Sequence, residues 1–78
     1  MEKLNETILE RGPEKRKISL WKSESNMSYT VFHEIIESAW MRIGKTDVVI
    51  SAEHLAMGEA YYRLAVGELV GYSYKVAA

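Results

Sequence analysis

Apolar and polar positions alternate with a period of two along residues 16–22, Arg-Lys-Ile-Ser-Leu-Trp-Lys. This period is typical of a strand with one buried face. The apolar face carries Ile18 and Leu20. The opposite face carries Lys17, Ser19 and Trp21.

Two later segments also have strand character. Val48-Val49-Ile50 is a β-branched run, and it predicts a strand over residues 46–50. A helix that starts at Thr46 or Asp47 and runs through the valines is the alternative. Residues 71–76 alternate and predict a final strand, with Tyr72, Tyr74 and Val76 on one face.

A helical period appears in the N-terminal half of the chain. Leu4, Ile8 and Leu9 have helical spacing and Gly12-Pro13 is a helix stop, so a short helix is predicted over residues 2–11. A longer helix is predicted over residues 28–43, with an apolar arc about 140° wide. That arc holds Phe32, Ile35, Ile36, Ala39, Trp40 and Ile43, and it makes Trp40 the largest predicted core side chain.

The segment of residues 52–70 predicts a helix with two apolar stripes. One is a core face in which Gly58 permits the close approach of a neighbour: Leu55, Gly58, Tyr62, Val66 and Leu69. The second stripe, Met57, Tyr61 and Leu64, lies nearly opposite. A helix that is apolar on both sides must be covered on both sides. Either the N-terminal helix covers the second stripe, or another chain does.

These elements predict a single α+β domain over residues 1–78. Their order is approximately α-β-α-β-α-β, with two main amphipathic helices against a short sheet of two or three strands. Residues 1–15 form the N-terminal helix and a basic linker, and residues 16–78 form the α/β core.

Composition excludes some kinds of site and indicates the cellular compartment. The chain has 78 residues, 47% of them apolar, a net charge of −1 and no cysteine, so disulfides and thiolate metal sites are excluded. The N-terminus is charged and polar, and no apolar run approaches the roughly 20 residues of a membrane span. We therefore expect a cytoplasmic protein without a membrane partner.

Two short motifs suggest chemistry that the sequence does not support. His33-Glu34-x-x-Glu37 has glutamate where a zinc-hydrolase helix needs its second histidine. Gly44-Lys45-Thr46 has Ala39 where a phosphate loop needs glycine, and it follows a predicted helix rather than a strand. We expect no catalytic residues, no metal and no cofactor.

The absence of catalytic groups and the second apolar stripe together favour a non-enzymatic interaction protein. Such a regulator, inhibitor or adaptor would bind the surface of a larger protein partner. Met57, Tyr61 and Leu64 are the candidate contact residues, since tyrosine and methionine are well suited to interfaces. A homodimer through the same stripe is the other reading of this surface.

A second hypothesis comes from residues 16–57. A lysine-rich strand followed by two helices with a glycine turn resembles the ribbon-helix-helix repressors, whose dimers place paired strands in the DNA major groove. The resemblance implies a dimer in which Lys17, Ser19 and Trp21 face bases. Basic residues beside them would contact the nucleic acid, so the candidate set is Lys15, Arg16, Lys17 and Trp21. One continuous helix from Thr46 to Leu69 would favour this hypothesis, whereas a strand at Val48–Ile50 would count against it.

Overall fold

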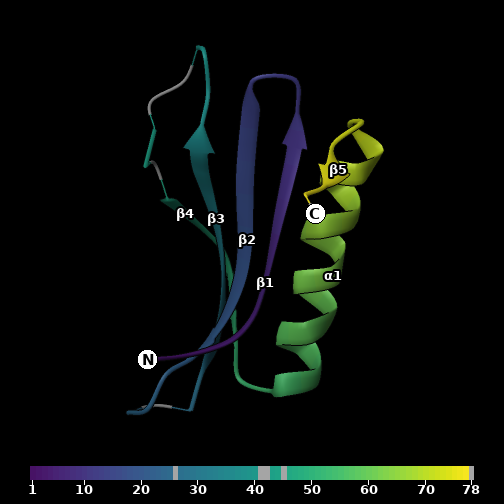
Figure 1. Cartoon of the computed structure of the whole chain (residues 1–78). Coiled ribbons are helices and arrows are strands. Elements are labelled where there is room, and N and C mark those ends of the chain that lie inside the picture. Colours follow the sequence, from purple (N-terminus) through teal and green to yellow (C-terminus); the bar gives the residue numbers. More distant parts are fainter. Residues whose placement is uncertain (26, 41–42, 45, 78) are drawn as a thin grey trace.

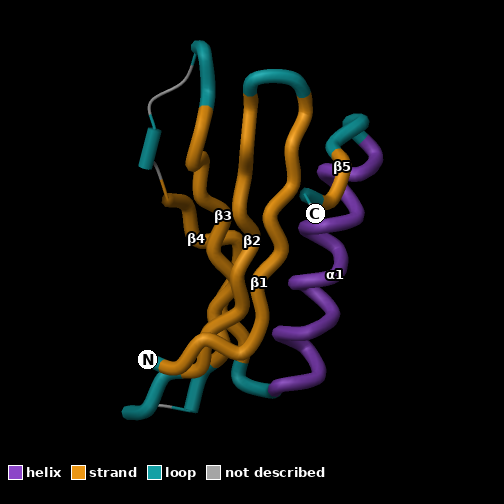
Figure 2. Tube along the Cα trace, viewed as in Figure 1, coloured by secondary structure: helices purple, strands orange, loops and turns teal. Residues whose placement is uncertain are grey.

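The protein is an antiparallel sheet with one helix packed on one of its faces. A computed structural model describes residues 1–25, 27–40, 43–44 and 46–77. The elements are β1 (Glu2–Arg11), β2 (Glu14–Lys22), β3 (Tyr29–Glu37), β4 (Thr46–Ala52), α1 (Leu55–Gly71) and β5 (Lys75–Val76). The five strands are ordered β4-β3-β2-β1-β5 (Figure 1). Figure 2 shows α1 lying along one face of the sheet, from the end of β4 towards β5.

The N-terminal segment is a strand, so the predicted helix over residues 2–11 is wrong. β1 pairs with β2 along most of its length and with β5 at Leu9 and Glu10. Gly12 has a φ of +56°, a value that glycine adopts at no steric cost. Gly12-Pro13 therefore forms the turn of a β-hairpin closed by Arg11 and Glu14, and it does not end a helix.

The predicted helix over residues 28–43 is wrong as well. β3 occupies Tyr29–Glu37 and lies between β2 and β4. Val31 and Ile35 are buried on the face towards α1, whereas Phe32 lies on the other face. Trp40 follows the strand and is 82% exposed, and Ile43 is exposed too, so neither belongs to the core. Met41 and Arg42, which the predicted helix included, lie outside the described residues.

The predicted strands over residues 16–22 and 46–50 are confirmed by β2 and β4, and the helix over residues 52–70 by α1. A helix running through the valines is excluded. The final strand is shorter than predicted, at Lys75–Val76. The structure therefore has one main helix and a sheet of five strands, and the predicted arrangement of two main helices against two or three strands is wrong.

The core lies between the sheet and α1. Its central cluster of buried residues comes from β1, β2, β3, α1 and the segment after α1: Leu9, Ile18, Leu20, Val31, Tyr62, Leu69 and Tyr74. Gly58, which belongs to the predicted core stripe, allows α1 to approach the sheet closely. A Cβ added at Gly58 would lie 2.9 Å from the Tyr29 Cβ and 3.2 Å from the Leu20 Cδ1. Any larger residue there would force α1 away from β2 and β3.

Candidate functional site

β4 forms one edge of the sheet, since β3 is its only neighbour in the strand order. The centre of this edge is apolar and open, with Val48 61% and Val49 45% exposed. Val31 pairs with Ile50 and Phe32 with Val48, so Val49 is the extra residue of a β-bulge. Asp47 is the only charged residue between Thr46 and Ala52. Proteins usually protect such an edge with charges, proline or a covering element.

A hollow lies between this edge and the N-terminal half of α1. Ile50 and Tyr61 form its inner part and pack against the buried core. Met57 stands at its rim and is 49% exposed. The lining residues are Ile50, Ser51, Ala52, Glu53, His54, Met57 and Tyr61. We call this hollow, together with the open edge of β4, the β4–α1 groove.

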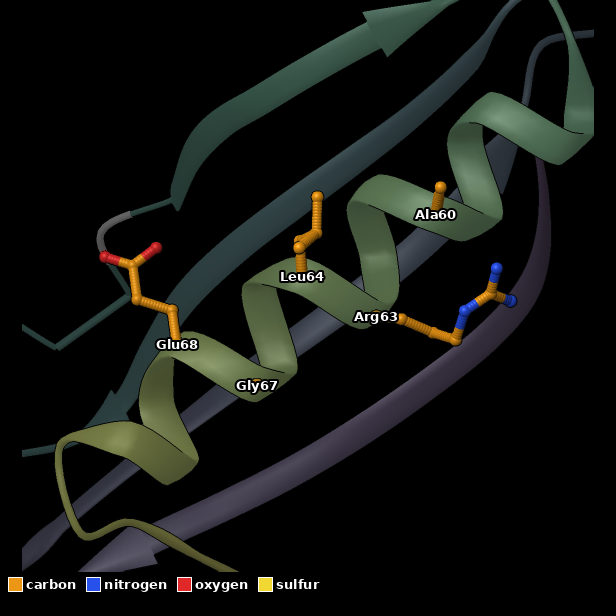
Figure 3. Close-up of a pocket in the computed structure, with 5 residues that line it drawn as sticks. All are labelled: Ala60, Arg63, Leu64, Gly67 and Glu68. Atoms are coloured by element: carbon orange, nitrogen blue, oxygen red, sulfur yellow. The ribbon is translucent and has the colours of Figure 1, made fainter.

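The predicted contact residues Met57, Tyr61 and Leu64 occupy one side of α1. Met57 and Leu64 are exposed, whereas Tyr61 is partly buried against the core. Figure 3 shows Leu64 projecting from the same side of α1 as Ala60 and Glu68, with Arg63 on the other side. An N-terminal helix does not cover this stripe, because residues 2–11 form β1, three strands away from β4.

Acidic residues surround the β4–α1 groove. Glu53 lines the hollow at the end of β4. Towards the start of β4, Asp47 and Glu68 both act electrostatically on the imidazole of His33. A ligand of the hollow therefore meets apolar side chains with the Glu53 carboxylate beside them.

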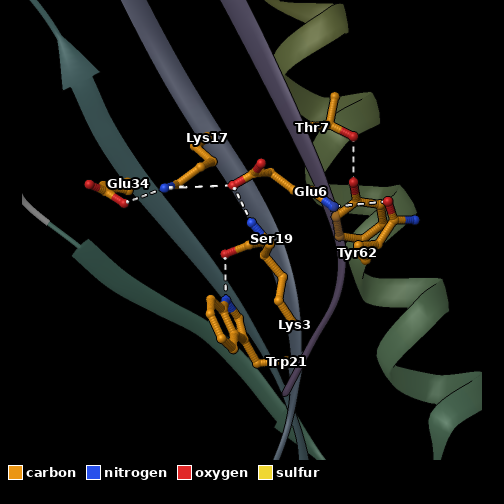
Figure 4. A network of polar contacts seen from close by, with 9 residues as sticks. Lys3, Glu6, Thr7, Lys17, Ser19, Trp21, Glu34 and Tyr62 are labelled. Carbon is orange, nitrogen blue, oxygen red and sulfur yellow. Dashed lines mark hydrogen bonds and ion pairs between the residues drawn. The ribbon is translucent and has the colours of Figure 1, made fainter. Parts of the chain in front are cut away.

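The structure separates the four candidate nucleic-acid residues. Lys15, Lys17 and Trp21 lie on the face of the sheet opposite α1, whereas Arg16 lies on the α1 side and contacts His33. The lysines have acidic neighbours: Lys15 Nζ lies 3.8 Å from Glu37, and Lys17 Nζ lies 3.7 Å from Glu6 and 3.2 Å from Glu34. Figure 4 shows Lys17 held between these last two carboxylates. Phosphates would be repelled by the same carboxylates.

Trp21 is also held in place. Its Nε1 donates a hydrogen bond of 3.0 Å to the Ser19 Oγ, and Ser19 is only 4% exposed although it lies on the open face (Figure 4). The indole therefore lies along its own strand. In addition, β4 stands where a ribbon-helix-helix protein has its second helix. The strand at Val48–Ile50 is the outcome that counts against the DNA-binding hypothesis.

A cluster of charges that the sequence analysis missed lies on the α1 side, at the end of the β1–β2 hairpin. The Glu14 carboxylate is 3.6 Å from Arg16 and 3.9 Å from Arg11, and it accepts a hydrogen bond from the Tyr74 hydroxyl. Arg11 also stacks over the Tyr74 ring at 4.4 Å and donates a 2.8 Å hydrogen bond to the Tyr72 carbonyl. The cluster thus fastens the segment after α1 to the hairpin. The alternation of Glu14 and Arg16 in one strand is the only signal of it in the sequence.

Glu14 in this cluster and His33 beside it both have lowered pKa values. The hydrogen bond from Tyr74, aided by the two arginines, outweighs desolvation and lowers the pKa of Glu14. Desolvation and the nearby Arg16 guanidinium lower the pKa of His33, against the opposing effect of Asp47 and Glu68. A neutral His33 can accept the contact from the Arg16 Nη1 at 3.3 Å.

Acid is expected to destabilise the fold in two steps. In the folded protein, the pKa values of His33 and Glu14 lie below their ordinary values of 6.5 and 4.5. As the pH falls through each ordinary value, the unfolded chain therefore takes up a proton before the folded protein does. The free energy of unfolding should fall as the pH drops below about 6.5, and again below about 4.5. Urea titrations at several pH values measure both steps. His33→Asn should remove the first step, and a wild-type stability that stays constant down to about pH 5 would contradict this assignment.

Within the described ranges, no three histidine, aspartate or glutamate side chains lie close enough together to hold a metal ion. No helix in that part of the chain is long and apolar enough to cross a membrane.

Comparison of the chain with protein-family models, curated proteins and solved structures yields no match.

Proposed function

We propose that the protein is a non-enzymatic protein-binding module whose β4–α1 groove receives an extended segment of a larger partner. The segment pairs with β4 as a further strand of the sheet. The observation that carries this proposal is the open apolar edge at Val48 and Val49, which stands beside the hollow lined by Ile50, Met57 and Tyr61.

Strand addition uses both components of this groove. The unpaired backbone groups of an edge strand supply hydrogen bonds, and pockets beside the edge select alternate side chains of the incoming segment. An added strand would direct every second side chain towards α1, where Met57 and Tyr61 offer apolar contact. Tyrosine and methionine suit this role because they bury much apolar area and adapt to the partner's shape.

The charges around the groove define the partner's chemistry. Glu53 lines the hollow at the end of β4, and Glu68 of α1 lies towards the other end. The segment that fits best has apolar or β-branched residues at its centre and lysine or arginine at its ends. By binding such a segment, this protein would act as a regulator, inhibitor or adaptor of the larger protein that contains the segment.

Selection from a random peptide library tests this proposal. Wild-type protein should enrich peptides with an apolar, proline-free centre and basic ends. The double variant Val48→Lys/Val49→Lys should bind them at least about tenfold more weakly, because lysines on an edge strand oppose strand addition. Val76→Lys is the control. Val76 is 62% exposed, close to the 61% of Val48, but it lies in the strand at the opposite edge of the sheet.

Equal binding of the enriched peptides by the wild type and the double variant would refute the groove as the contact surface. Enrichment of acidic peptides, or of peptides with proline at their centre, would refute the chemistry assigned to the partner. Circular dichroism of each variant establishes that the charge changes leave the fold intact.

A further inference from the structure

Five uncharged residues form a seam along the side of α1 that faces away from the sheet, with the charged residues Arg63 and Glu68 beside it. Its positions recur at alternating intervals of three and four: Met57, Ala60, Leu64, Gly67 and Gly71. This is the spacing of the a and d positions of a helix that packs along another helix. Met57 is 49% exposed and Leu64 64% exposed, so the sheet does not use this seam. A helix face that meets only water is normally polar.

Packing within one chain does not require glycine at two positions of the seam. A Cβ added at Gly67 or Gly71 would meet nothing within 4 Å, in contrast to Gly58, which the sheet crowds. Glycine is among the least favourable residues inside a helix. Its use at two open positions of the same face is explained if another helix backbone approaches there.

The seam also has a shallow hollow around Leu64. It is lined by Ala60, Arg63, Leu64, Gly67 and Glu68 (Figure 3). In a parallel helix pair, a side chain at Leu64 enters the space between four residues of the facing helix, at positions 60, 63, 64 and 67. These four positions all line the hollow, so it lies where the Leu64 side chain of a second copy would pack.

Charge selects the orientation of the two helices. Arg63 and Glu68 flank the seam on opposite sides, five residues apart (Figure 3). In a parallel pair, Arg63 of each copy comes beside Glu68 of the other, so two ion pairs form about the two-fold axis. An antiparallel pair would bring like charges together at both positions. Arg63 lies 3.8 Å from Glu59 of its own helix and keeps that neighbour in either case.

We propose that two copies of the chain associate through this seam, with their α1 helices parallel and their sheets on the outside. Leu64 of each copy packs into the hollow around Gly67 of the other. The association goes beyond the proposed function, since it leaves the β4 edge open and shares with the β4–α1 groove only Met57 at the rim. A dimer of this kind would present two β4–α1 grooves.

Sedimentation equilibrium over a range of protein concentrations tests the association. We expect a reversible dimer for the wild type and a monomer for Gly67→Lys. That lysine has open space around it in a single chain and is a better helix former than glycine, so the melting temperature of dilute protein should not fall. A wild type that stays monomeric at about 1 mM, or a Gly67→Lys variant that dimerises like the wild type, would overturn the proposal.

A cross-link tests the orientation, because the chain has no cysteine of its own. Met57→Cys should form a disulfide between copies under mild oxidation, since a parallel pair places the two Met57 positions opposite each other. Glu59→Cys, on the same helix but off the seam, is the control and should stay reduced. Failure of Met57→Cys to cross-link, or equal cross-linking at Glu59, would overturn the parallel seam. The peptide-binding test changes Val48 and Val49, which lie outside the seam, so the two proposals can fail separately.

Discussion

Leu20→Ala is expected to lower the free energy of unfolding by about 2–5 kcal/mol, the usual cost of emptying a buried leucine site. Leu20 is 2% exposed and lies in β2, the middle strand of the sheet, between β1 and β3. It also lies under Gly58, where α1 approaches the sheet. For a domain of this size, each kcal/mol corresponds to about 4–8 °C in melting temperature. Urea denaturation of the wild type and the variant measures the difference.

Trp40→Ala is the control for this prediction. Trp40 is the larger residue, but it is 82% exposed, so its removal should change the free energy of unfolding by no more than about 0.5 kcal/mol. The sequence pattern alone leads to the opposite expectation, because it places Trp40 in the core of a helix. A large loss of stability in Trp40→Ala, with little loss in Leu20→Ala, would contradict the sheet and support the predicted helix over residues 28–43 instead.

Tyr74→Ala is expected to have an effect of similar size, about 3–5 kcal/mol, typical of a buried aromatic residue. Tyr74 is 4% exposed and belongs to the core, although it lies beyond the end of α1. Its ring lies under Arg11 at 4.4 Å and near Arg16 at 5.4 Å. Loss of the ring would also free the last strand from the hairpin, so the melting temperature should fall and residues 75–77 should lose protection against amide exchange.

Tyr74→Phe separates the ring from the hydroxyl. The variant keeps the ring packing and the contacts with the arginines, but it loses the hydrogen bond to Glu14. We expect it to cost clearly less stability than Tyr74→Ala. If both variants lost the same stability, the hydroxyl rather than the buried ring would be what holds the C-terminal segment.

Two of the elements that the sequence predicts correctly have only one consistent period. β2 alternates strictly, and Ile18 and Leu20 are indeed buried on one face. α1 keeps a helical period over more than four turns, and three of its five predicted core residues are buried: Gly58, Tyr62 and Leu69. Val66 is only partly buried, and Leu55 is 43% exposed, so its assignment to the core is wrong. In both segments, local pattern and tertiary packing favour the same structure.

β1 and β3 were misassigned because their apolar spacing fits two structures. Residues four apart share a helix face, but they also share a strand face, as Val31 and Ile35 do in β3. What decides between the two is pairing. β3 has a strand on each side and β1 pairs with β2 and β5, and such long-range partners do not appear in a local pattern.

The candidate site was predictable in part. Met57 and Leu64 could be identified as an uncovered stripe from the helical period, and both are exposed. The β4 edge could not be identified from the sequence, because whether a strand lies at an edge depends on the order of strands in the sheet. The charge cluster at Glu14 was missed for a related reason: the turn at Gly12-Pro13 had to be recognised as a hairpin before Arg11, Glu14 and Tyr74 could be brought together.

Amide hydrogen exchange of the protein, free and saturated with an enriched peptide, tests the proposed function most directly. An added strand protects the backbone groups that it pairs with, so we expect the gain in protection to be concentrated in Thr46–Ala52, with a smaller gain in the first turns of α1. The strand at the opposite edge, Lys75–Val76, should exchange equally fast in both states. Protection that appears in β2 or β5 while Thr46–Ala52 stays unchanged would contradict the β4–α1 groove as the binding surface.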